Sequence, residues 1–183
     1  MENAKKTRLN RNDWINGALE LMTSVGIEGV RIVPLAAKLG VTSGSFYWHF
    51  KNRQELLDAV ISYWEVHMTD EAIEAARNVQ LDPKGRIHGL MKQVMTEGMA
   101  RYDLAIWHWA QCDEAAQTVF TRVLDKRFAF AAWMFSQAGF DEEEAKTRGR
   151  LMVVYMMGES TLVPGNLKSR MELANQQFEI LTS

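Results

Sequence analysis

The stretch GVTSGSFYWHFKNR, residues 40–53, brings together side chains that could do chemistry at very close spacing. Its hydroxyl, imidazole and basic groups form hydrogen bonds or hold anions and are costly to bury, whereas its phenylalanine and tryptophan side chains favour burial. On a helix, Phe46 and Phe50 share one face, while Ser43, Tyr47 and Lys51 share another. One face must therefore pack against the protein, and the other must contact a different molecule.

The polar face suits the major groove of double-stranded DNA. Hydroxyl groups and an imidazole can contact base edges, and Tyr47 and Lys51 can hold phosphates. Gly44 leaves the amino end of the helix without bulk, so free backbone amides of the first turn can approach an anion. These residue types therefore predict a helix that contacts DNA.

Other residues with reactive side chains lack the spacing of a catalytic or metal site. The four histidines, at positions 49, 67, 88 and 108, form no pair at the usual metal-binding spacings. His67 lies one turn before Asp70 and Glu71, which is typical of a solvated surface pair. No glycine-rich phosphate loop or serine-elbow sequence occurs. The sequence predicts no enzyme, no metal site and no cofactor.

Charge is divided unevenly along the 183 residues, whose net charge is -2. Residues 1–53 hold eight basic and four acidic side chains, a net +4, and the remainder carries -6. A basic end and an acidic body suit a polyanionic partner at one end. The single cysteine, Cys112, and the lack of a signal-peptide-like segment favour the cytoplasm. The longest apolar run, Phe128–Phe135, is too short to span a membrane.

Hydrophobic periodicity predicts helices nearly throughout and no strand, so the expected fold is all-α. The first predicted helix has its cap and acidic first turn at Asn12-Asp13 and ends at Gly26. Two short helices follow, one at 33–39 and one capped by Thr42 or Ser43, and a turn at Gly40 joins them. Further helices follow to residue 181, with a loop at 163–166. Three helices at the amino end thus form a helix-turn-helix domain, residues 1–52, followed by a helical body, residues 53–183.

Residues 25–60, VGIEGVRIVPLAAKLGVTSGSFYWHFKNRQELLDAV, resemble the DNA-binding domain of the TetR family of bacterial transcriptional repressors. The resemblance lies in the helix lengths, the glycine turn, the Phe/Tyr/His/Phe order and the basic residue at position 53. It implies base or groove contacts from Ser43, Gly44, Ser45, Trp48 and His49, and phosphate contacts from Thr42, Tyr47, Lys51 and Arg53.

One position departs from the family pattern. The family usually opens the second helix with hydroxyl residues, whereas this chain has Arg31, Ile32 and Val33. Either Arg31 reaches the phosphate instead, or that anchor is weakened.

The resemblance also implies a homodimer that binds a palindromic DNA operator and is released by a small hydrophobic effector. Methionine-rich middle helices could line the effector pocket. The candidate ligand-binding residues are Trp64, His67, Met68, Met91, Met95, Trp107, His108, Cys112, Trp133 and Tyr155. The last two helices carry narrow apolar stripes typical of a helix seam. The candidate dimer residues are Gly149, Met152, Val153, Met156, Met171, Ala174 and Phe178.

A second interpretation remains open from the residues alone. A helical protein could use the same motif for protein contact or bind a small molecule without binding DNA. Salt-dependent binding to duplex DNA would separate these two functions.

Overall fold

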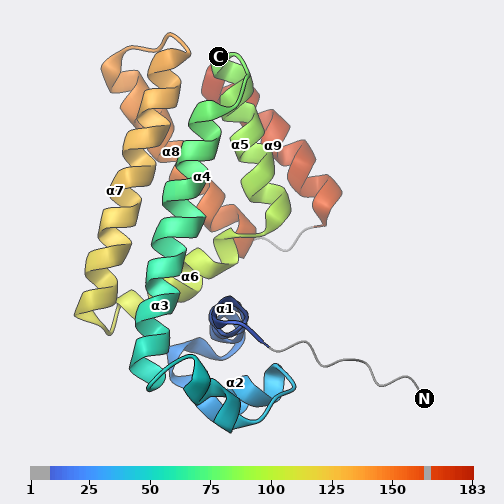
Figure 1. The fold of residues 1–183 in the computed structure, drawn as a ribbon. Coiled ribbons are helices and arrows are strands. Elements are labelled where there is room, and N and C mark those ends of the chain that lie inside the picture. The colour runs from blue at the N-terminus through green and yellow to red at the C-terminus, as the bar shows by residue number, and fades with distance from the viewer. Residues whose placement is uncertain (1–8, 163–165) are drawn as a thin grey trace. The chain divides into compact units, whose positions relative to one another are not determined.

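The protein is helical over residues 9–162 and 166–183, the part of the chain described by this computed structural model. Those residues contain no strand, which confirms the all-α prediction. They form two compact units, one comprising the described residues up to Tyr63 and the other those from Trp64 onward. The helices (Figure 1) are α1 (Arg11–Gly29), α2 (Ile32–Lys38), η1 (Ser43–Trp48), α3 (Arg53–Glu65), η2 (Val66–Asp70), α4 (Glu71–Asn78), α5 (Pro83–Glu97), α6 (Ala100–Ala110), α7 (Glu114–Gln137), α8 (Glu142–Leu162) and α9 (Leu167–Thr182).

Helix α1 begins earlier than the sequence predicts. The backbone amide of Asp13 donates to Asn10 Oδ1 at 3.0 Å, and the amide of Asn10 donates to Asp13 Oδ2 at 2.6 Å. This reciprocal pair is a capping box, which requires a separation of three residues. The cap is therefore Asn10 and not Asn12, whereas Asp13 is an acidic residue of the first turn, as the sequence predicts. The sequence predicts that Gly26 ends the helix; its φ of 69° does break the helical geometry there, but α1 continues to Gly29.

The first unit is built around aromatic and aliphatic side chains from α1, α2 and η1. Trp14, Leu35 and Phe46 are each fully buried. The sequence predicts a domain boundary before Arg53, whereas the two units divide inside α3, after Tyr63. Because both units share one helix, the position of a functional boundary stays a prediction.

The second unit has its core between α5, α7, α8 and α9. Helices α7 and α8 pack along each other, and α5 packs on α9. In the run from Phe128 to Phe135, which the sequence predicts to be surrounded by other helices, Phe130, Met134 and Phe135 are buried. The predicted loop at 163–166 falls mostly outside the described residues. Its last residue, Asn166, caps α9 by accepting a hydrogen bond from the amide of Ser169 at 3.0 Å.

Gly149 allows α7 and α8 to approach closely. A Cβ atom at this position would lie 2.7 Å from the backbone nitrogen of Ala132 and 2.9 Å from the carbonyl carbon of Ala131. Backbone atoms cannot give way as a flexible side chain can, so we expect Gly149→Ala to destabilise the protein by about 1–3 kcal/mol. Urea unfolding would measure this change.

Gly89 provides the matched control. It also lies inside a helix, but an added Cβ would meet only Leu81 Cδ1, at an ordinary 3.6 Å. Gly89→Ala should therefore be neutral or stabilise the helix by up to about 1 kcal/mol, because alanine favours helix more than glycine does. Equal effects at the two glycines would contradict the close approach of α7 and α8.

Candidate nucleic-acid interface and internal cavity

The segment that the sequence predicts to contact DNA is a short 3₁₀ helix, η1. It follows α2 after Gly40, whose φ of 68° lies in the left-handed region that favours glycine. The sequence predicts an α-helix capped by the side chain of Thr42 or Ser43. Thr42 does occupy the N-cap position, but its side chain makes no capping hydrogen bond. A 3₁₀ helix has three residues per turn instead of 3.6, so residues three apart lie on one face.

Two phenylalanines hold this segment in place, as predicted. Phe46 is fully buried and Phe50 is 2% exposed, with their rings stacked at 5.4 Å. The Trp14 ring meets Phe46 edge-on at 5.4 Å and 80°. Such aromatic pairs favour defined relative orientations, so they position the opposite face of the segment.

The opposite face exposes two large aromatic side chains. Tyr47 and Trp48 are 62% and 78% exposed. Large aromatic side chains exposed side by side mark a contact surface. Of the predicted DNA contacts, Arg31, Thr42, Gly44, Tyr47, Trp48 and Lys51 are exposed, and Ser43, Ser45, His49 and Arg53 are half-buried.

Polar side chains from outside η1 also fix its end. Arg11 donates to the backbone carbonyl of His49 at 2.6 Å, and its guanidinium lies 4.1 Å from the centre of the Phe50 ring. Glu55 accepts from the amide of Lys51 at 2.8 Å and from Arg11 at 3.2 Å. These hydrogen bonds, that of the Lys51 amide first, lower the pKa of Glu55.

Arg53 has partners inside the first unit. Its Nε donates to the carbonyl of Val30 and its Nη2 to the carbonyl of Ile27, both at 2.6 Å. Arg53 therefore ties the start of α3 to the end of α1, and its phosphate contact stays a prediction. Arg31, at the N-cap of α2, is exposed and donates from Nε to the carbonyl of Glu28 at 3.0 Å.

The second unit contains a cavity of about 100 Å³ that is partly open to the surface. Its wall is mostly apolar, and methionine is its commonest residue. Side chains from several helices contribute to it: Met68, Thr69, Ala72, Ile73, Leu90, Val94, Met99, Ala100, Asp103, Arg127, Phe130, Ala131, Met134, Met152, Val153, Met156 and Met157. Methionine is flexible and polarizable, so a wall of this kind can adapt to ligands of different shape.

Three polar residues form one part of the cavity wall. Arg127 donates from Nη1 to Asp103 Oδ2 at 2.8 Å and from Nη2 to Thr69 Oγ1 at 3.1 Å. The other oxygen of Asp103 accepts from Trp64 Nε1 at 2.8 Å. The side chains of Asp103 and Arg127 are only 9% and 18% exposed. The sequence interpretation missed this pair because its members lie on different helices, α6 and α7.

Of the predicted ligand-binding residues, only Met68 lines this cavity. Trp64, Met91 and Met95 are fully buried elsewhere in the second unit, and Trp64 stacks on Phe120 at 5.7 Å. The other predicted residues, which also lie away from the cavity wall, are His67, Trp107, His108 and Cys112, all exposed, and Trp133 and Tyr155, both half-buried. Helical spacing identifies apolar faces, but it does not show which of them meet at a cavity.

The structure also corrects the predicted dimer face of α8. Gly149, Met152, Val153 and Met156 are buried in the core of the second unit, and the last three line the cavity. Their stripe therefore closes the chain's own core, because it faces α7. On the predicted face of α9, Ala174 is fully buried, Phe178 stacks on the His88 ring at 4.5 Å, and Met171 is 38% exposed.

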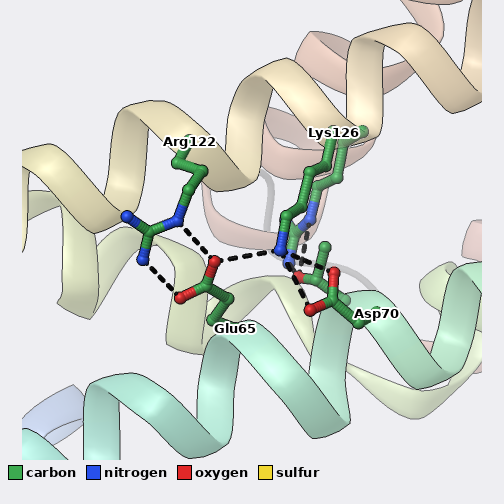
Figure 2. A network of polar contacts seen from close by, with 6 residues as sticks. Glu65, Asp70, Arg122 and Lys126 are labelled. Carbon is green, nitrogen blue, oxygen red and sulfur yellow. Dashed lines mark hydrogen bonds and ion pairs between the residues drawn. The ribbon is translucent and has the colours of Figure 1, made fainter.

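A charged cluster flanks η2, a single turn of π-helix between α3 and α4 (Figure 2). Glu65, just before this turn, accepts from Arg122 Nε and Nη2, both at 2.6 Å. Lys126, one helical turn after Arg122 on α7, donates to Glu65 Oε1 at 2.9 Å and to Asp70 Oδ1 at 2.8 Å. Both ends of the π-turn are thus fixed to α7, and Met68 and Thr69 between them line the cavity.

The Glu65 carboxylate gives the cluster a pH dependence. Hydrogen bonds from Arg122, and then from Lys126, lower its pKa from 4.5 to about 2, although burial opposes the shift. A pKa lowered by folding stabilises the folded state fully above pH 4.5, and this stabilisation is lost as the pH falls towards 2. We expect the thermal unfolding midpoint to fall across that window, and Glu65→Gln to flatten the fall.

The exposed pair between Lys168 and Glu172 serves as the control for this titration. Glu172→Gln should leave the pH dependence of the unfolding midpoint unchanged, because exposed ion pairs stabilise proteins little. If the unfolding midpoints of Glu65→Gln and of the parent protein fell in parallel below pH 4.5, protonation of Glu65 would not be the cause of the fall.

Among the described residues, no helix combines the length and the apolar character needed to cross a membrane.

Residues 15–60 match the family described as bacterial regulatory proteins, tetR family. The chain is 49% identical over 53 residues to the class D tetracycline repressor protein of Escherichia coli, a match that covers 29% of this chain and 24% of the repressor. The matched part thus spans about a quarter of that relative's length.

Solved structures share the fold over nearly the whole chain. AibR in complex with isovaleryl coenzyme A and operator DNA has a TM-score of 0.72 at 17% identity, covering 94% of this chain and 97% of that one. FadR from Bacillus subtilis in complex with stearoyl-CoA has a TM-score of 0.69 at 14% identity, covering 95% and 98%. Residues 15–60, which contain the glycine turn and η1, are therefore identified as a domain of the tetR family of bacterial regulatory proteins.

Proposed function

We propose that the protein is a transcriptional regulator that binds operator DNA through η1 and responds to a small hydrophobic effector. The observation that carries this proposal is the exposed surface formed by Tyr47 and Trp48 of η1 and by Lys51 shortly after it, beside the buried rings of Phe46 and Phe50. A rigidly supported polar and aromatic face suits groove and phosphate contacts.

The two solved relatives support the effector part of the proposal. One was crystallised with isovaleryl coenzyme A and operator DNA, and the other with stearoyl-CoA. The apolar cavity in the second unit is the candidate effector site in this chain, and its volume of about 100 Å³ limits it to a molecule much smaller than an acyl-coenzyme A. An effector that binds one conformation better than another would shift the population between states that differ in DNA affinity. We propose that DNA release follows, so that the protein acts as a repressor.

We further propose that two copies bind a palindromic operator. One short helix makes few base contacts, and regulators of this type read two half-sites about 34 Å apart. The exposed face of α8 supports a contact between copies, because Leu151 and Val154 lie one turn apart there and are 57% and 54% exposed. Sedimentation should show a dimer that Leu151→Glu separates, whereas Leu81→Glu, at an exposed leucine before α5, should leave it intact.

Titration of the protein with duplex DNA from its own upstream region, at several salt concentrations, tests DNA binding. The logarithm of the affinity should fall linearly with the logarithm of the salt concentration, with a slope of about 0.9 per phosphate contact. Tyr47→Ala should lose most of the affinity, and Lys51→Ala should reduce the slope by about 1.

Lys168→Ala is the control for a lost positive charge, since this lysine is exposed on α9. It should change neither the affinity nor the slope. Absent or salt-independent binding to every fragment would favour a helical protein that does not bind DNA.

A further inference from the structure

The cavity wall contains one negative and one positive side chain, so its net charge is zero. Of its seventeen residues, only Asp103 and Arg127 have ionised side chains, and these two are paired at 2.8 Å. The remaining wall is apolar apart from the hydroxyl of Thr69. Any charge that a ligand brought in would meet no unpaired opposite charge on the wall.

Burying such an extra charge is costly. A charged group transferred from water into an apolar site loses its hydration, and only a direct opposite charge with further hydrogen bonds compensates for the loss. Here Asp103 is already bonded to Arg127 and Trp64, and Arg127 is already bonded to Asp103 and Thr69. A carboxylate ligand would lie close to Asp103, and an ammonium ligand would lie close to Arg127. Both would be repelled by one member of the pair.

The same pair can still hold an uncharged polar group. A carboxylate has about four acceptor positions and a guanidinium has five N–H donors. Asp103 accepts two of the hydrogen bonds described above, and Arg127 donates three, from Nε, Nη1 and Nη2. A hydroxyl group can both donate to Asp103 and accept from Arg127, so it complements both members at once.

The volume limits the apolar part of such a ligand. A cavity of about 100 Å³ holds more than a water molecule, whose share of the liquid is about 30 Å³. It is smaller than the dry cavity of about 150 Å³ that accepts benzene. Flexible methionines allow some expansion. The apolar body that fits is a short alkyl group of about five carbons.

We propose that the cavity selects a small, uncharged, amphiphilic molecule whose single hydroxyl-like group binds at the Asp103 and Arg127 pair. The pair would therefore exclude charged effectors, which we call the charge filter, and would bind the polar group of an uncharged one. This inference deepens the proposed function, since it names the chemical class of the effector, but its test does not involve DNA.

Three five-carbon probes with one polar end each test the proposal: 1-pentanol, pentanoate and pentylammonium. Methyl resonances of isotope-labelled methionines report occupancy directly, because Met68, Met134 and Met152 line the cavity whereas Met91 and Met95 are buried outside it. We expect 1-pentanol to shift the cavity methionines and to bind at least about tenfold more tightly than either charged probe. Met91 and Met95 should shift little.

Charge-altering variants should reverse the ranking. Asp103→Asn keeps an oxygen that can accept from Trp64 but leaves Arg127 unbalanced, so pentanoate should become the preferred probe. Arg127→Gln leaves Asp103 unbalanced, so pentylammonium should become preferred. Circular dichroism checks that each variant is folded, and the ranking in the parent protein decides the question if a variant is not.

Two results would overturn the proposal. One is a charged probe that binds the parent protein as tightly as 1-pentanol, and the other is the absence of any shift of the cavity methionines with all three probes. If 1-pentanol binds as expected while no DNA fragment is bound, the regulator proposal fails and the charge filter stands. If a DNA fragment is bound and a charged probe binds more tightly than 1-pentanol, the charge filter fails and the regulator proposal stands.

Discussion

Phe46→Ala is expected to destabilise the first unit by about 3–5 kcal/mol and to abolish DNA binding. Phe46 is fully buried, and its ring contacts the rings of Trp14, Tyr47 and Phe50 at 5.4 Å each. Truncation to alanine removes these contacts and leaves a cavity beneath η1. Urea unfolding followed by circular dichroism would measure the loss, and DNA titration would measure the consequence for binding.

A variant at the adjacent Tyr47 distinguishes a loss of stability from a loss of DNA contact. Its side chain is 62% exposed and adds one edge-on contact with Phe46. Tyr47→Ala should therefore cost less than about 1 kcal/mol of stability, in keeping with most surface substitutions, while it still weakens DNA binding. If both variants were equally unstable, the assignment of a buried and an exposed face to η1 would be wrong.

Asp103→Ala is expected to destabilise the second unit by about 3–5 kcal/mol. The substitution leaves the Arg127 guanidinium largely buried without its carboxylate partner, and it removes the acceptor of Trp64 Nε1, on a side chain that is fully buried. Breaking one side of a buried ion pair is far more costly than removing both, because an uncompensated charge remains. Thermal and urea unfolding would measure the change.

A double variant distinguishes this cause from a general loss of packing. Asp103→Leu combined with Arg127→Met removes both charges and keeps apolar volume, so it should be less destabilising than Asp103→Ala alone. Glu142→Ala, which breaks an exposed pair with Lys146 on α8, should have no measurable effect. A double variant that was less stable than the single one would contradict the argument.

The first unit was largely predictable because its signals are local in the sequence. The four-residue spacing of Phe46 and Phe50 predicted the buried face, and glycine at position 40 predicted the turn. The 3₁₀ geometry of η1 was not predictable, since helix type in so short a segment depends on the packing of its anchors. The intramolecular bonds of Arg53 were also missed, because its acceptors on Ile27 and Val30 are backbone carbonyls.

The cavity was not predictable because it depends on contacts between distant helices. Met152 and Met156 lie on an apolar stripe that fits a core, a pocket or a dimer seam equally well in the sequence. Only the packing of α8 on α7, with Gly149 at the close contact, assigns that stripe to the interior. Asp103 and Arg127 are 24 positions apart, and no short-range pattern connects them.

The π-turn η2 also explains a break in the burial pattern of the second unit. After fully buried Trp64, the next buried side chain is Thr69, five residues later, followed by half-buried Ile73 at the usual spacing of four. An uninterrupted α-helix repeats every 3.6 residues and would instead turn Glu71, seven residues after Trp64, towards the apolar core. The π-turn thus acts as a one-residue phase correction that rotates everything after it by about 100°. Deleting one of residues 66–68 would instead place Thr69 and Ile73 four and eight residues after Trp64, on the same face of a regular α-helix. The π-turn therefore accommodates one extra residue while it keeps Glu71 out of the core.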